Sequence, residues 1–239
     1  AIITMFFVGT QAGPGQSLVS AILLTGVILL GVFMTFWVSR LLSGTILRGV
    51  PSSFTLELPP YRRPQIGKVI ARSVLDRTLF VLGRAVAVAA PAGLLIWLCA
   101  NVTVGGVSIL NHCTGFLDPF ARLLGLDGVI LMAFILGFPA NEIVVPIIIM
   151  SYLSTGTLLE LDDLGALHAL LVEHGWTWLT AVCTMLFSLM HWPCSTTCMT
   201  IGKETRSLKW TLISFAVPTA VGMAVCFLTA SAARLCGLA

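Results

Sequence analysis

The stretch FILGFPANEIVVPIIIM, residues 134–150, determines how the rest of the sequence is interpreted. It lies in an apolar run long enough to cross a bilayer, yet an Asn-Glu pair stands near its centre. A carboxylate at that depth normally faces a bundle interior or an aqueous path. Gly137, Pro139 and Pro146 surround the pair, so we expect the helix to break or kink and to leave carbonyl groups free beside Glu142. Many transporters hold substrate at such breaks; the alternative is a kinked structural helix with Glu142 paired or protonated.

The composition is that of a membrane protein. Of the 239 residues, 57% are hydrophobic and only 10% are charged, whereas a soluble domain has about 25% charged residues. The apolar runs have the length of helices and do not alternate. We therefore predict an all-α, polytopic integral membrane protein with about five membrane segments, at least one of them broken or re-entrant. The formal net charge of +3 is too small and too local to indicate nucleic-acid binding, and the 7 cysteines, an odd number lying mostly in apolar runs, do not predict a disulfide framework.

The chain divides into three predicted parts. Residues 1–48 hold the first membrane segment or segments, and residues 49–77 form a proline-rich connector that ends in a basic amphipathic helix. Residues 78–239 form a membrane domain with broken helices. Most of the basic residues fall between residues 40 and 84, so the positive-inside rule predicts that the connector is cytoplasmic.

The loop charges also indicate where a span is interrupted. Residues 154–175 carry no Lys or Arg, whereas 202–209 are basic and are predicted to be cytoplasmic. A simple zigzag of straight helices does not satisfy these signs, so we expect residues 129–153 to form two half-helices or a re-entrant element. Residues 103–127 are predicted to be a Gly-rich linker with a short helix at 116–124.

A second group of polar residues lies in the predicted span 176–201, which contains its own predicted break at Pro193. His191, Cys194 and Cys198 are spaced i, i+3 and i+7, which places them on one helix face if the helix continues through Pro193. Imidazole and thiolate bind borderline and soft divalent metals, and Glu142 could complete such a site. The spacing matches no soluble zinc motif, and a cysteine in an apolar helix is commonly a small hydrophobic residue, so both interpretations stay open. No nucleophile elbow or metallopeptidase motif is present, so we do not expect an enzyme.

Three blocks resemble the C-terminal membrane half of the bacterial ferrous iron transport protein B family, including its second gate segment. They are FTLELPPYRRP at 54–64, GFPANEIVV at 137–145 and PCSTTCMTIGKETRSLKW at 193–210. The sequence departs from the family at Asn141, where the family often has Lys. His191 and Cys198 are not assumed to be general features.

The resemblance implies a gate-type membrane permease domain for Fe²⁺ uptake, in the bacterial inner (cytoplasmic) membrane. The candidate metal-binding residues remain those of the two polar groups described above, Glu142, Cys194, Cys198 and His191. In the family, transport is coupled to a cytosolic GTPase domain of the same polypeptide, which would hold GTP and Mg²⁺. We expect that N-terminal domain to lie outside this sequence, which would be the C-terminal part of a longer polypeptide.

The other implied partners are the lipid bilayer and small accessory iron-transport proteins. We expect no nucleic-acid partner. The alternatives are a nucleoside or other solute carrier with a gate-type fold, or a non-transporting membrane anchor for a GTPase.

Overall fold

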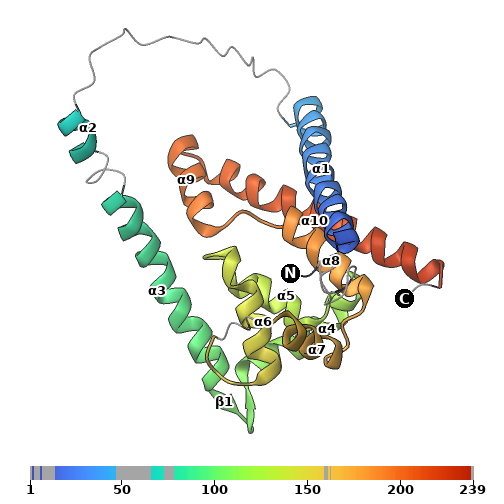
Figure 1. Ribbon diagram of the computed structural model, residues 1–239. Coiled ribbons are helices and arrows are strands. Elements are labelled where there is room, and N and C mark those ends of the chain that lie inside the picture. The colour runs from blue at the N-terminus through green and yellow to red at the C-terminus, as the bar shows by residue number, and fades with distance from the viewer. Residues whose placement is uncertain are drawn as a thin grey trace.

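The computed structural model of the protein describes residues 2, 6, 14–46, 66–72, 78–158, 161 and 163–237. The described chain is almost entirely helical, as predicted, with one short antiparallel hairpin of strands (Figure 1). Its elements follow in chain order: α1 Pro14–Gly44, α2 Ile66–Arg72, α3 Phe80–Asn101, β1 Thr103–Val104, β2 Val107–Ser108, α4 Ile109–Leu123, α5 Gly128–Leu136, the 3-10 helix η3 Asn141–Ile143, α6 Val144–Leu153, α7 Leu164–Glu173, α8 Trp178–Met190, α9 Ser195–Thr205 and α10 Leu208–Leu235.

Three of the described helices are long and apolar enough to cross a membrane, namely α1, α3 and α10. Two further spans arise if each sharply bent pair is counted as one, which gives up to 5. In the first pair α4 and α5 meet at 109°, and in the second α7 meets the α8–α9 segment at 108°. The prediction of a polytopic helical membrane protein with broken or re-entrant segments is therefore confirmed.

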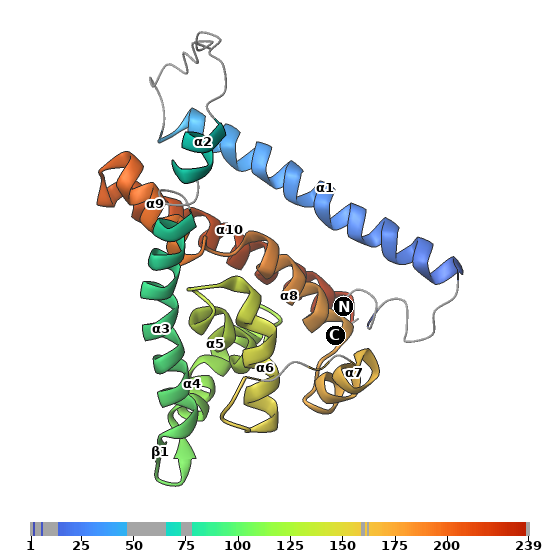
Figure 2. The same cartoon turned by 60° about the vertical axis from the view of Figure 1, so that its left-hand side comes forward.

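The core of the protein is formed by the short helices α4 to α8 together with α10. Ile130, Ile147, Cys183, Phe187 and Cys226 have no solvent exposure there. Helices α1 and α3 flank this group on different sides (Figure 2). Large apolar side chains are exposed all around α1, which suits a helix that faces lipid acyl chains.

Polar side chains fix where several of the short helices begin. The Asp127 carboxylate accepts a hydrogen bond from the Ile130 amide at 2.6 Å and caps α5. Ser108 caps α4 and Thr177 caps α8 in the same way. Such caps satisfy amide groups that have no partner within the helix, which is why helices begin at these residues even in an apolar sequence.

The helix break predicted within residues 134–150 is present, but of the two prolines only Pro139 lies in it. Helix α5 ends at Leu136, residues 137–140 are not helical, and η3 leads into α6, which packs beside α5 (Figure 2). Pro139 lies in the break. Pro146, which was also predicted to break or kink the helix, instead lies in the first turn of α6. Proline is tolerated there because the first-turn amides have no partner within the helix.

The structure also tests the predicted helix at 116–124 and part of the predicted connector at 49–77. The predicted short helix at 116–124 is wrong at its start, because α4 begins at Ile109 directly after the β hairpin, capped by Ser108. Helix α2 confirms helical structure within the predicted amphipathic segment over Ile66–Arg72. The proline-rich part of the connector, residues 49–64, lies outside the described residues.

Candidate functional site

The two interrupted helices meet at their breaks. The Ser195 amide, at the start of α9, donates a hydrogen bond of 2.9 Å to the Phe138 carbonyl in the break after α5. The break leaves this carbonyl without a helical partner, and the first amides of α9 likewise lack one. One bond therefore satisfies both orphan groups and joins two segments that are far apart in the sequence.

Cys194 stands directly after the second break, as its sequence position predicted. It has an extended backbone, with φ −61° and ψ 159°, and precedes the first turn of α9. Its Sγ lies 3.2 Å from Thr196 Oγ1 and 3.1 Å from Thr197 Oγ1. The thiol is partly exposed and sits at a helix N-terminus, where the backbone dipoles favour negative charge.

Cys198 lies one turn further along α9 and is buried. Its amide bonds to the Cys194 carbonyl at 3.0 Å, and its Sγ lies 3.5 Å from the Pro193 carbonyl oxygen. Cys198 lines a cavity of about 550 Å³ together with Phe138 and Ser195, and Arg206 lies on the same wall. The second thiol thus faces a space that begins where the two breaks meet.

His191 does not share a helix face with the cysteines, so that prediction is wrong. Helix α8 ends at Met190, and the chain at His191 is extended with ψ −178° before α9 starts, so no single helix runs from His191 to Cys198. His191 Nδ1 lies 2.8 Å from the Ser188 carbonyl oxygen. The residue lines a different cavity of about 490 Å³ between α1, α8 and α10.

Glu142 is exposed and belongs to η3, between the break and α6. Its neighbour Asn141 lines a third cavity, of about 350 Å³, that also includes Phe134 and Ser188. Within the described ranges, no three His, Cys, Asp or Glu side chains are grouped as they would be around a metal ion. The four candidate ligands therefore do not form a single metal-binding cluster, and their metal role stays a prediction.

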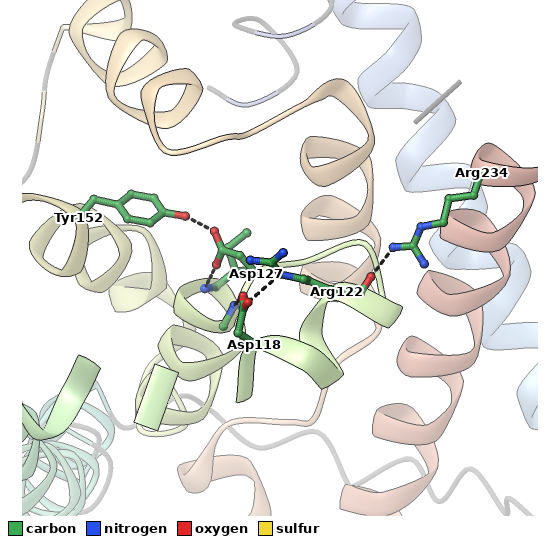
Figure 3. A network of polar contacts seen from close by, with 7 residues as sticks. Asp118, Arg122, Asp127, Tyr152 and Arg234 are labelled. Carbon is green, nitrogen blue, oxygen red and sulfur yellow. Dashed lines mark hydrogen bonds and ion pairs between the residues drawn. The ribbon is translucent and has the colours of Figure 1, made fainter. Parts of the chain in front are cut away.

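A polar network holds the other end of the re-entrant element, and the sequence interpretation missed it (Figure 3). Tyr152, near the end of α6, donates a very short hydrogen bond to the Asp127 carboxylate at the start of α5. The Tyr152 hydroxyl also accepts a bond of 2.8 Å from Nε1 of Trp176, in the turn before α8. This network ties the two legs of the α5–α6 element to each other and to α8. The Asp-Gly sequence at 127–128 is a helix-start signal that could have identified Asp127, but nothing in the sequence pairs it with Tyr152.

Three further polar contacts surround this network. Asp118 accepts a bond of 3.1 Å from the Gly128 amide and forms an ion pair of 2.6 Å with Arg122. Arg234, near the end of α10, donates a short hydrogen bond to the Arg122 carbonyl (Figure 3). Helices α4, α5 and α10 are thereby linked close to the base of the re-entrant element.

The fold and the two breaks that meet define a polytopic α-helical membrane protein built from discontinuous helices, the kind used by transporters. The chain belongs to the membrane half of the ferrous iron transport protein B family: residues 82–208 match the Gate family, described as nucleoside recognition, and residues 24–77 match the ferrous iron transport protein B C terminus. The resemblance drawn from the three sequence blocks is therefore confirmed.

Curated relatives agree with this assignment. The chain is 30% identical over 232 residues to a protein named Fe(2+) transporter FeoB from Staphylococcus aureus (strain COL), an alignment covering 93% of this chain and 32% of that protein. Proteins of the same name from Leptospira interrogans (26%, 88% of this chain and 33% of the relative) and Synechocystis (26%, 89% and 33%) are also similar. The chain thus spans about a third of the length of the curated relatives it matches. No solved structure gave a significant match.

Proposed function

We propose that this chain forms a membrane permease domain for Fe²⁺, with the ion passing where the two broken segments meet. The observation that carries the proposal is the hydrogen bond between the Ser195 amide and the Phe138 carbonyl. It places a thiol-bearing helix start beside an unwound stretch that leads to Glu142. Relatives named Fe(2+) transporter support Fe²⁺ as the substrate.

The donor atoms suit a borderline divalent ion. Cys194 and Cys198 offer sulfur, His191 offers imidazole nitrogen, and Glu142 offers carboxylate oxygen, whereas Mg²⁺ and Ca²⁺ prefer oxygen alone. Conduction needs sites that release the ion again, so few ligands at each position are better than a closed cage. The spread of the four candidates over separate positions, with one thiol in each of two successive turns, agrees with weak sequential binding.

In the complete protein, we propose that transport is coupled to a cytosolic GTPase domain that holds GTP and Mg²⁺, and that the protein lies in the bacterial inner membrane. The connector at 49–77 would transmit the nucleotide state, with Arg62 and Arg63 in its proline-rich part. Proline-rich segments are stiff enough to act as spacers, which supports a mechanical role. Small accessory iron-transport proteins would act on the same cytosolic side.

The test is Fe²⁺ flux through the purified, reconstituted complete protein. Cys194→Ser and Glu142→Gln should each lower flux by at least about tenfold, since changing even the outer-shell partners of metal ligands lowers metal affinity or activity about 10–100-fold. Cys236→Ser and Glu173→Gln are matched controls because both residues are exposed away from the breaks, and they should leave flux unchanged. Wild-type flux and unaltered metal selectivity in both test variants would refute the metal path.

A second candidate is an organic-solute carrier, because the matched Gate family is described as nucleoside recognition. The cavity of about 490 Å³ that His191 lines, with Trp210 and Ser214 opposite, has the volume of a small-molecule pocket. Saturable nucleoside uptake that competes with no metal would favour this function. A non-transporting anchor predicts uptake of neither substrate.

A further inference from the structure

Six rings form a continuous aromatic cluster between the two breaks. Phe134 lies 4.9 Å from Phe187 and 5.2 Å from His191 between ring centroids. Trp192 stacks on Phe215 at 5.6 Å, and Phe215 in turn meets Phe138 edge-on at 5.8 Å. The members of this aromatic cluster are Phe134, Phe138, Phe187, His191, Trp192 and Phe215.

Rings of the aromatic cluster line two cavities that also contain polar groups of the two broken segments. Phe134 is in the wall of the cavity that contains Asn141, next to Glu142. Phe138 is in the wall of the cavity that contains Ser195 and Cys198. Rings of one cluster thus line a cavity at each of the two broken segments.

Polar atoms without partners lie at the edge of the rings. Ser195 Oγ and Trp192 Nε1 are buried, each in a residue only 7% exposed, and have no hydrogen-bond partner among the described residues. Buried polar groups are almost always hydrogen-bonded, so these atoms mark places that a polar species reaches. Ser195 lines the cavity that contains Cys198 and Phe138, so this buried hydroxyl without a partner lies in the wall of the same space as the Phe138 ring.

We propose that the aromatic cluster is a hydrophobic gate in the ion path, with Phe138 as its moving ring. This rests on the proposed function. Apolar constrictions block hydrated ions by excluding water, and the rings of this cluster pack where the two broken segments meet. We assign Phe138 as the moving ring because it is only partly buried and residues 137–140 are not helical, with its backbone held by one hydrogen bond to Ile135 and one from Ser195. Phe134 and Phe187 are buried in the core and stay in place.

The experiment measures passive cation entry into vesicles that contain the complete protein, without nucleotide. Phe138→Ala should raise passive influx of Fe²⁺ and of Mg²⁺ at least about tenfold, because an open gate no longer excludes hydrated ions. Phe138→Trp, which keeps a ring in place, should remain closed. Phe36→Ala is the matched control, because Phe36 is 72% exposed on α1, far from the cluster in sequence.

Phe215→Leu keeps most of the core volume but removes the ring that Phe138 contacts. This variant should therefore also raise passive cation influx, and it tests the gate if Phe138→Ala does not fold. Wild-type passive influx in folded Phe215→Leu, and in Phe138→Ala if that variant folds, overturns the gate. Saturable Fe²⁺ uptake by wild type in the same vesicles, now supplied with GTP and Mg²⁺, tests the proposed function separately. A leak in the variants without wild-type Fe²⁺ uptake would keep the gate and refute the assigned substrate.

Discussion

Replacing Tyr152 by Phe should strongly destabilise the protein, although it removes a single oxygen atom. The hydroxyl serves two partners: it donates to the Asp127 carboxylate and accepts from Trp176 Nε1 at 2.8 Å. Trp176 is only 5% exposed, so its N–H has no access to solvent as a replacement partner. The ring itself stays, and with it the stacking on His174 at 4.3 Å between centroids, so the effect comes from the polar atom alone.

The magnitude follows from the two lost bonds. A hydrogen bond to a charged group contributes about 1.5–3 kcal/mol, and a buried donor left without a partner costs about 1–3 kcal/mol. The two terms share one atom and are not fully additive, so we expect a loss of about 3 kcal/mol. For a chain of this size that lowers the Tm by roughly 6–12 °C.

The assay is thermal unfolding in detergent, followed by tryptophan fluorescence, for Tyr152→Phe, Asp127→Asn and the double variant. Asn remains a good helix cap, so Asp127→Asn keeps the start of α5 while weakening the bond to Tyr152. The double variant should be clearly more stable than the sum of the single losses predicts, since both changes remove the same contact. A Tm within about 2 °C of wild type for Tyr152→Phe would refute the role of this network.

Two further predictions concern packing and topology. Gly128→Ala should lower the free energy of unfolding by about 3 kcal/mol, because the added Cβ would clash with the Thr114 carbonyl, a backbone group that cannot move aside. Gly93→Ala is the control: no atom lies within 4 Å of its Cβ position, so stability should change by less than about 1 kcal/mol. Equal melting curves for the two variants would contradict this prediction. Cysteines introduced at Ser53 and Ser207, in a background without native cysteines, should react with an impermeant reagent only from the cytoplasmic side; reaction of either site only from outside would reverse the predicted orientation.

The sequence alone predicted the features that depend on residues close to one another in the chain. Apolar runs of helical length predicted membrane helices, because in lipid the backbone must satisfy its own hydrogen bonds. Pro139 and Pro193 predicted the two breaks, since a proline inside a helix removes a donor wherever the segment lies. Pro146 shows the limit of that rule: its effect depends on where the helix starts, and this start was decided by the break before it.

Tertiary structure alone decided which groups came together across the chain. No local pattern pairs the Phe138 carbonyl with the Ser195 amide, because each is an orphan group that any distant partner could satisfy. The extended backbone at His191 turned its ring toward a cavity beside α1 and away from Cys198, although the spacing in sequence suggested a shared helix face. Tyr152 met Asp127 because the re-entrant element returns to its own base, and a fold of that kind is fixed by packing between helices rather than by the residues of either helix.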